Sequence, residues 1–379
     1  MKTIIVGCCV GLVVLVVFGV VGGLRLWRQF SEIGPGLEMS PALEVARAVK
    51  GDDLLTKDEF WRGTGVGQVT DIVEDQSRII IVSLSGAVFV DEQATTLSSV
   101  EFAGRTSTGF PTTSHVDAID VEGDGVFEFM NRGSWGVAAS LIDSKGDTVW
   151  RYGEGASGVD DMAAGDIDGD GELEFVAGFN GGGGIHVVET DGHQVWRQAD
   201  GNVWHVETVD TDGDGRTEIV HSNAGGQMKV RDAQGNVVNQ SRPPAYFSEF
   251  SLCNWPGKQD PQHALLSERG TIWVLGFDGK SVARLGAPDC GTLGHARGVP
   301  VKLRADHDEY FAVLVEFRNW ERSILYLYDP DHKLVYQEVL AEACACLAAV
   351  PSGTSTAERL LLGGDQRVWQ YTLAAAGAD

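Results

Sequence analysis

The segment "GDIDGDGELEF" at residues 165–175 decides the fold, because it concentrates negative charge in a pattern that recurs along the chain. Four of its carboxylates occupy positions 1, 3, 5 and 9 of a loop; these are Asp166, Asp168, Asp170 and Glu174. Glycines occupy positions 4 and 6, Gly169 and Gly171. Carboxylates this close repel one another unless a cation lies among them. The segment therefore predicts a metal-binding loop.

The spacing of the loop indicates calcium. Carboxylates at positions 1, 3 and 5 can all point inward only where the chain curls tightly, which the two glycines permit. The backbone carbonyl of position 7 and the Glu at position 9 complete an oxygen shell that suits Ca²⁺, and the loop contains no Cys or His that would favour zinc. An EF-hand would require a Glu at position 12, where this chain has Ala177, and flanking helices, whereas "LEFVAGF" is typical of a strand.

The same pattern occurs in two further loops, "DVEGDGVFE" at residues 120–128 and "DTDGDGRTE" at residues 210–218. The loops start at residues 120, 166 and 210, which are 46 and 44 residues apart. This is the period of a four-stranded propeller blade. The predicted calcium ligands, with position 7 contributing its carbonyl, are Asp120, Glu122, Asp124, Val126, Glu128, Asp166, Asp168, Asp170, Glu172, Glu174, Asp210, Asp212, Asp214, Arg216 and Glu218.

Strand and turn signals repeat around each loop and extend beyond the three loops in both directions. The copy upstream keeps the strand pattern but retains only Asp71 and Asp75 of the ligand pattern, and the copies downstream lose the carboxylate loop. The last copy lacks an outermost strand, so we expect the segment around Trp61 to pair with it and close a ring. The sequence predicts an all-β fold, a seven-bladed β-propeller with four-stranded antiparallel blades.

These loops and blades resemble FG-GAP or VCBS-type repeats, the calcium-loop blades of integrin alpha-subunit propellers and of many bacterial surface proteins. The resemblance covers residues 59–373. The Asp pattern of the family is complete in loops 166–174 and 210–218, whereas Glu122 replaces the central Asp of the first loop. The resemblance implies about three Ca²⁺ sites on an extracellular-type binding propeller.

A second resemblance concerns "DSKGDTVW" and "ETDGHQVW", which share the D/E-x-x-G-x-x-x-W spacing of the Trp-docking repeats in quinoprotein propellers. In those proteins the tryptophans lock neighbouring blades together. We therefore expect Trp61, Trp150 and Trp196 to pack between neighbouring outer strands.

The N-terminal region is expected to be a membrane anchor. Residues 4–24 form an uncharged apolar run of 21 positions, which is long enough to cross a bilayer of about 30 Å as a helix. The run is longer than a signal-peptide core, and no small-x-small cleavage site follows it. These features predict an anchor over 1–30, a linker over 31–58 and a propeller over 59–379.

The flanking charges leave the membrane orientation open, since Lys2 precedes the apolar run and Arg25 and Arg28 follow it. Calcium loops of modest affinity fill only where calcium is near millimolar, which favours an extracytoplasmic propeller, periplasmic or at the cell surface. Cys253, Cys290, Cys344 and Cys346 would then allow disulfides in any of three pairings, with four buried free thiols as the alternative.

The chain carries 29 basic and 54 acidic residues, a formal net charge of −25. This balance argues against nucleic acid and anionic lipid surfaces as partners, because both require basic patches. The expected function is a non-enzymatic scaffold that binds a protein or glycan at the propeller face.

Polar side chains also recur on the strands that precede the loops. His115, Asp161 and His205 lie five residues before the first Asp of each loop, and Asp117 and Glu207 lie three before it. Alternation along the innermost strands places these side chains toward the central channel. They are expected to be polar groups around channel water. The alternative is a carbohydrate-active enzyme similar to a polysaccharide lyase, with His115 and His205 as weak candidates for a catalytic base.

Overall fold

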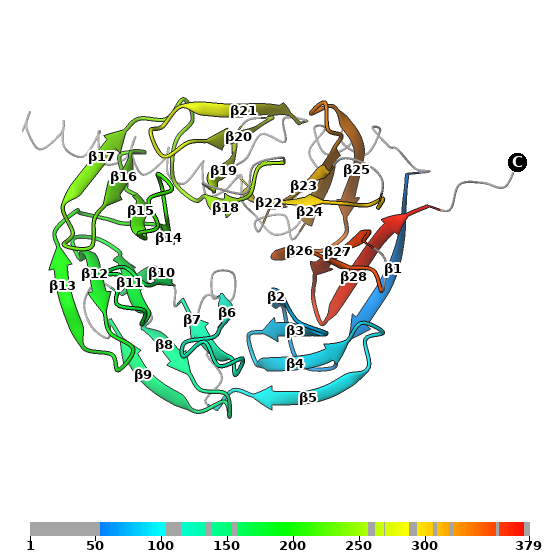
Figure 1. Cartoon of the computed structure of the whole chain (residues 1–379), viewed down its shortest axis with the longest axis horizontal. Coiled ribbons are helices and arrows are strands. Elements are labelled where there is room, and N and C mark those ends of the chain that lie inside the picture. Colours follow the sequence, from blue (N-terminus) through cyan, green and yellow to red (C-terminus); the bar gives the residue numbers. More distant parts are fainter. Residues whose placement is uncertain are drawn as a thin grey trace, which may run out of the picture.

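The computed structural model describes residues 54–103, 115–132, 138–153, 158–256, 262–268, 270–287, 294–305, 309–317, 322–353 and 356–374. These residues form a ring of seven blades, each a four-stranded antiparallel sheet (Figure 1). Six blades consist of four consecutive strands, and the seventh joins the two ends of the described chain. The predicted architecture and blade number are confirmed.

The six consecutive blades contain β2 to β25. Three of them are formed by β2 Val69–Asp75, β3 Arg78–Ser83, β4 Gly86–Asp91, β5 Thr96–Glu101; β6 Val116–Ile119, β7 Glu128–Asn131, β8 Ala139–Ile142, β9 Thr148–Tyr152; and β10 Val159–Gly165, β11 Glu174–Phe179, β12 Gly184–Val188, β13 Gln194–Gln198. The other three are formed by β14 Val206–Val209, β15 Glu218–Ser222, β16 Met228–Arg231, β17 Val237–Ser241; β18 Ser251–Cys253, β19 His263–Glu268, β20 Thr271–Leu275, β21 Ser281–Gly286; and β22 His295–Val301, β23 Tyr310–Phe317, β24 Arg322–Tyr328, β25 Leu334–Leu340.

The closing blade combines the two ends of the described chain in the order β1-β28-β27-β26. Its strands are β1 Leu55–Arg62, β26 Cys346–Pro351, β27 Glu358–Gly363 and β28 Arg367–Leu373. β1 pairs antiparallel with β28, with Leu55 opposite Leu373 and Trp61 opposite Val368. The prediction that the segment around Trp61 supplies the missing outer strand is therefore confirmed.

The first strand of each blade lies innermost, since β10 contacts β14, β18 contacts β22, and β2 contacts both β6 and β26. Successive strands of a blade run in opposite directions, so the loops from first to second strand lie at the same end as the turns from third to fourth strand. We call this end of the ring the loop face; it carries all three predicted metal loops. The described chain also begins and ends there, where the Ala374 backbone N–H donates to the Leu54 carbonyl at 3.0 Å.

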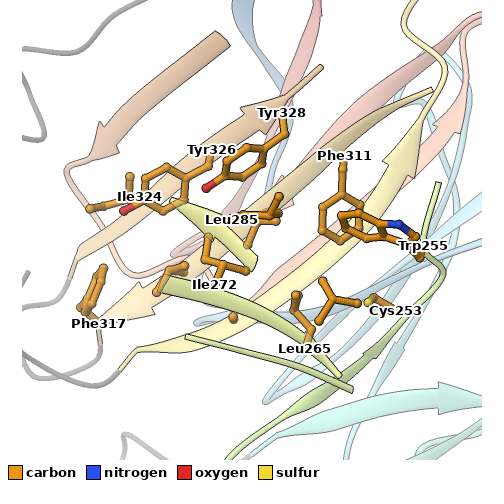
Figure 2. Close-up of a cluster of buried hydrophobic side chains, with 14 residues drawn as sticks. Cys253, Trp255, Leu265, Ile272, Leu285, Phe311, Phe317, Ile324, Tyr326 and Tyr328 are labelled. Carbon is orange, nitrogen blue, oxygen red and sulfur yellow. The ribbon is translucent and has the colours of Figure 1, made fainter. Parts of the chain in front are cut away.

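The core consists of apolar layers between neighbouring blades. Figure 2 shows the layer between the blades β18–β21 and β22–β25, where the rings of Trp255 and Phe311 meet edge to face at 5.0 Å. Middle strands face such a layer on both sides, which is why all six residues of β11 are buried. Uninterrupted apolar strands are therefore expected here rather than an alternating pattern.

Two outer-strand tryptophans dock on the next blade, as predicted. The Trp150 indole N–H donates to the Thr190 carbonyl at 2.8 Å, and that of Trp196 donates to the Ala233 carbonyl at 2.8 Å. Each indole packs on a turn glycine with positive φ; for Gly192, φ is 88° and an added Cβ would lie 3.0 Å from the Trp150 ring. Trp61 lies in the apolar layer between the closing blade and the blade β2–β5.

The three described cysteines are buried free thiols, which excludes a disulfide among them. Cys344 packs between the closing blade and the blade β22–β25, whereas Cys346 packs between the closing blade and the blade β2–β5. The two thiols therefore lie on opposite sides of one sheet. Cys290 lies outside the described residues, as does the predicted membrane span at residues 4–24. Within the described part of the chain, no helix is long and apolar enough to cross a bilayer.

Candidate metal loops and central cluster

The three predicted loops connect the first and second strands of three consecutive blades: β6 to β7, β10 to β11, and β14 to β15. In each loop the glycines at positions 4 and 6 adopt positive φ, between 68° and 95°. A Cβ added at these glycines would meet no atom within 4 Å. The glycines are therefore required by backbone conformation and not by space.

The carboxylate at position 1 organises each loop by accepting backbone hydrogen bonds. Asp166 accepts from the N–H groups of Gly169 at 2.8 Å and Gly171 at 3.1 Å. Asp210 accepts from Gly213 and Gly215, both at 2.7 Å. Burial opposes ionisation of Asp210, but these N–H groups together lower its pKa below the usual value. The backbone of each of these two loops thus curls around its position-1 carboxylate.

The Glu at position 9 is the first residue of the second strand, and one of its oxygens accepts the backbone N–H of position 2. Glu174 accepts from Ile167 at 2.8 Å, and Glu218 accepts from Thr211 at 2.9 Å. In the first loop Glu128 accepts from Val121 at 3.3 Å. Each of these Glu side chains therefore closes its loop by a hydrogen bond to the backbone of position 2.

Two loops bring three carboxylates together. The oxygens of Asp166, Asp168 and Glu174 lie within 4.8 Å of one another, and so do those of Asp210, Asp212 and Glu218. These are positions 1, 3 and 9. The side chains at position 5 instead accept the backbone N–H of position 7, as Asp170 does from Glu172 at 2.8 Å. The donor set is made entirely of hard oxygens, which fits Ca²⁺.

The first loop differs, as its sequence suggests. Residues 120–128 are all described, and their carboxylates do not form such a triple. Burial raises the pKa of Glu128 to about 7, and the nearby Glu122 contributes to the rise. Arg78 of the preceding blade donates to the Gly125 carbonyl at 2.6 Å, so a protein cation already contacts this loop. The longer Glu122 side chain is the departure that separates this loop from the other two.

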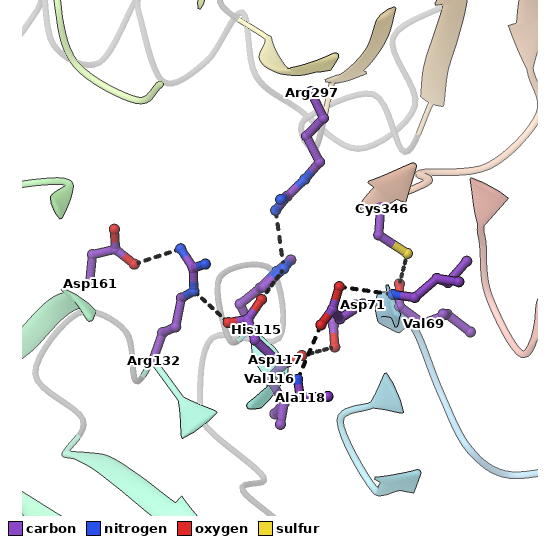
Figure 3. A network of polar contacts seen from close by, with 12 residues as sticks. Val69, Asp71, His115, Val116, Asp117, Ala118, Arg132, Asp161, Arg297 and Cys346 are labelled. Atoms are coloured by element: carbon purple, nitrogen blue, oxygen red, sulfur yellow. Dashed lines mark hydrogen bonds and ion pairs between the residues drawn. The ribbon is translucent and has the colours of Figure 1, made fainter. Parts of the chain in front are cut away.

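The polar residues predicted to face the channel do meet there, and the residues between them pack into the blades. We define the central cluster as Asp71, His115, Asp117, Arg132, Asp161, His205, Glu207 and Arg297; Figure 3 shows six of them. His115, Asp161 and His205 are 8%, 6% and 5% exposed. Val116, Met162 and Val206 are fully buried in the apolar layers, which confirms the predicted alternation.

Ion pairs connect the blades across this cluster. Arg132 donates from Nε to Asp117 of its own blade at 2.5 Å, and from Nη1 to Asp161 of the next blade at 3.4 Å. His205 contacts Asp161 through Nδ1 at 2.5 Å and Glu207 through Nε2 at 3.2 Å. Burial alone would lower the pKa of His205, but the two carboxylates raise it to about 9. Burial likewise opposes ionisation of Asp161, yet His205 and Arg132 hold its pKa at about 2.

Arg297 of β22 reaches across the channel, and its Nη2 donates to His115 Nε2 at 3.0 Å (Figure 3). His115 Nε2 is therefore an acceptor, and His205 uses both ring nitrogens as donors. Neither histidine offers a free lone pair to a substrate proton in this arrangement. The geometry favours an electrostatic bridge between blades over a catalytic base.

Asp71 does not belong to a loop, which corrects its assignment as a remnant of the ligand pattern. It lies within β2 and accepts the backbone N–H of Ala118, in the neighbouring blade, at 3.1 Å. Burial and the adjacent Asp117 raise the pKa of Asp71 to about 7. The sequence contained a signal for this position, since Asp71 precedes Asp117 by 46 residues, the spacing of the first two loops.

Arg132 and Arg297 were missed by the sequence analysis. Arg132 follows β7 and has no counterpart at the same place after the other two loops, where the chain has Gly178 and Ser222. Arg297 lies in a blade without a carboxylate loop. No repeated spacing points to either residue, so only the closed ring reveals their role.

Comparison with known proteins supports the fold. No family model and no curated protein matches the chain. A chain in the crystal structure of BBS1N in complex with ARL6DN matches with a TM-score of 0.56 and 11% identity, over 85% of this chain and 98% of that chain. A streptogramin B lyase structure matches with a TM-score of 0.54 and 9% identity, over 84% of this chain and 98% of that chain. At these identities the likeness concerns the fold alone.

Proposed function

We propose that this protein is a membrane-anchored, extracytoplasmic calcium-binding propeller of the FG-GAP or VCBS type, and that it acts as a scaffold that binds a protein or glycan. The observation that carries the proposal is the pair of carboxylate triples, Asp166/Asp168/Glu174 and Asp210/Asp212/Glu218, each within 4.8 Å. Three negative charges at such distances are stabilised by a divalent cation. The seven-bladed fold is compatible with a scaffold of this kind.

Bound calcium would stiffen the loop face. Asp166, Asp168 and Glu174 would hold the ion in one blade, and their counterparts would hold it in the next. Because the ion binds only the folded loop, each site would add about 1.4 kcal/mol to the folding free energy at ten times the dissociation constant. The loop 120–128 is expected to bind more weakly, since its carboxylates do not form such a triple.

Calorimetric titration of calcium into the full chain in detergent tests the proposal. Asp168→Asn and Asp212→Asn should each reduce the stoichiometry by one site. Asp232→Asn is the matched control, because Asp232 accepts backbone N–H groups in an exposed turn of the loop face without belonging to a triple. An unchanged stoichiometry in both loop variants would exclude these loops as calcium sites.

Partner binding rests on the architecture. Propeller loops present variable side chains on a rigid ring, and the BBS1N structure was determined in complex with ARL6DN. The enzyme alternative has weaker support, because His205 is flanked by two carboxylates and His115 accepts from Arg297. If the wild-type protein cleaves an acidic polysaccharide and the double variant His115→Gln/His205→Gln folds but does not, the enzyme would be favoured over the scaffold.

A further inference from the structure

Exposed aliphatic side chains recur at one level around the ring. Each of five consecutive outer strands, β5, β9, β13, β17 and β21, carries one as its second residue. We call them the aliphatic row: Leu97 (58% exposed), Val149 (53%), Val195 (49%), Val238 (58%) and Val282 (39%). Outer strands begin at the turn from the third strand, so the row lies at the loop face.

The row does not contribute to the core. Trp150 and Trp196 follow Val149 and Val195 directly and pack against the next blade, so the valines point away from that contact. Val126, in the first loop, adds a further exposed aliphatic side chain (45%) at the same face. Single exposed aliphatic residues are ordinary, and what distinguishes this row is its repetition at one level on five consecutive blades.

The described chain enters the propeller at this same face. Leu54 hydrogen-bonds to Ala374 at the loop-face end of β1 and β28, and 29 residues separate it from the apolar run that ends at residue 24. A random coil of 29 residues would span about 30 Å on average. A compact domain of about 320 residues has a diameter of about 50 Å. A tether whose average span is shorter than the domain would on average hold the face to which it is attached nearest the anchor.

We propose that the loop face lies against the phospholipid surface of the membrane that holds the N-terminal anchor, with the aliphatic row in contact with the headgroup region. The inference rests on the anchor of the proposed function. A membrane is favoured over a soluble partner because the chain enters the propeller at the loop face, so the N-terminal anchor would hold this face near the bilayer. The acidic loops disfavour anionic lipids, so the expected lipid is zwitterionic.

Photo-cross-linking of the full chain in phosphatidylcholine vesicles, in calcium-containing buffer, tests this orientation. Benzoylphenylalanine replaces Val195 at the loop face or Gly182 in the β11–β12 turn, at the opposite end of the same blade. Gly182 is exposed, and an added Cβ there meets no atom within 4 Å. Val149 provides a second loop-face position should the first disturb folding.

Lipid adducts several-fold more abundant at Val195 and Val149 than at Gly182 are expected. Equal adducts at both ends of the blade, or cross-links from Val195 to a second copy of the chain, would overturn the inference. A carbonate wash separates the two proposals. Protein that leaves the vesicles lacks the anchor, which overturns the membrane attachment and this inference together. Protein that stays without lipid adducts at Val195 and Val149 overturns this inference alone.

Discussion

Replacing Arg132 by Met should destabilise the propeller strongly, because two buried carboxylates would lose the cation they share. The side chains of Arg132, Asp117 and Asp161 are 16%, 16% and 8% exposed. Removing one partner of a buried ion pair costs about 3–5 kcal/mol, since the remaining charge stays desolvated. With an unfolding entropy of about 0.7 kcal/mol/K for some 320 residues, the melting temperature should fall by roughly 4–7 °C.

Thermal unfolding of the full chain in detergent at pH 7 measures the effect, with Arg62→Met as the matched control. Arg62 also pairs with a carboxylate, Glu59, but the two side chains are 51% and 34% exposed, so little change is expected. The deficit of Arg132→Met should shrink as the pH falls, because protonation neutralises the abandoned Asp117. If Arg132→Met and Arg62→Met melt together, the central carboxylates are hydrated and the burial argument is wrong.

Three further predictions follow from the same contacts. Trp150→Ala should lower the free energy of unfolding by about 3–5 kcal/mol in denaturant titration, because a buried indole and its hydrogen bond to Thr190 are lost, whereas the exposed Val149→Ala should be nearly neutral. Gly213→Ala should weaken calcium binding and cost about 1–2 kcal/mol, because a φ of 80° disfavours a side chain, while Gly182→Ala should do neither. Raising the pH from 7 to 9 should destabilise the protein through His205, because its pKa of about 9 in the folded state lies above the unfolded value of about 6.5. The stability that protonated His205 contributes at low pH is therefore lost as the pH rises. A His205→Gln variant whose stability falls equally steeply with pH would contradict this.

The repeat made the architecture predictable. Three loops with constant spacing fix the length of a blade, and a chain that begins with a spare outer strand and ends without one indicates ring closure. The alternation of His115 and Val116 was also readable, because an inner strand has one side toward the channel and one toward the apolar layer. Local pattern determines each of these features.

The pairings across blades were not predictable from such patterns. Arg132 reaches Asp161 and Arg297 reaches His115 only because distant strands are brought around a common channel. Arg297 and His115 lie 182 residues apart in the chain. Asp71 is different, because its spacing of 46 residues from Asp117 can be read from the sequence. That spacing assigns Asp71 to the central cluster and not to a loop.

The protein balances its negative charge in two different ways, so removal of calcium is expected to affect the loops and the central cluster differently. In the central cluster, Arg132 and His205 pair with carboxylates from within the chain, and the charge of Arg297 acts on the nearby Asp71 and Asp117. In the loops 166–174 and 210–218 the carboxylates accept only backbone N–H groups and the Thr211 hydroxyl, which carry no net charge. A chelator should therefore loosen the loop face and leave the inter-blade ion pairs intact. Loss of calcium should appear as increased amide exchange in the loops and at the starts of β11 and β15, while β6 and β14 remain protected; uniform exchange throughout the ring would mean that the ions, and not the central cluster, hold the blades together.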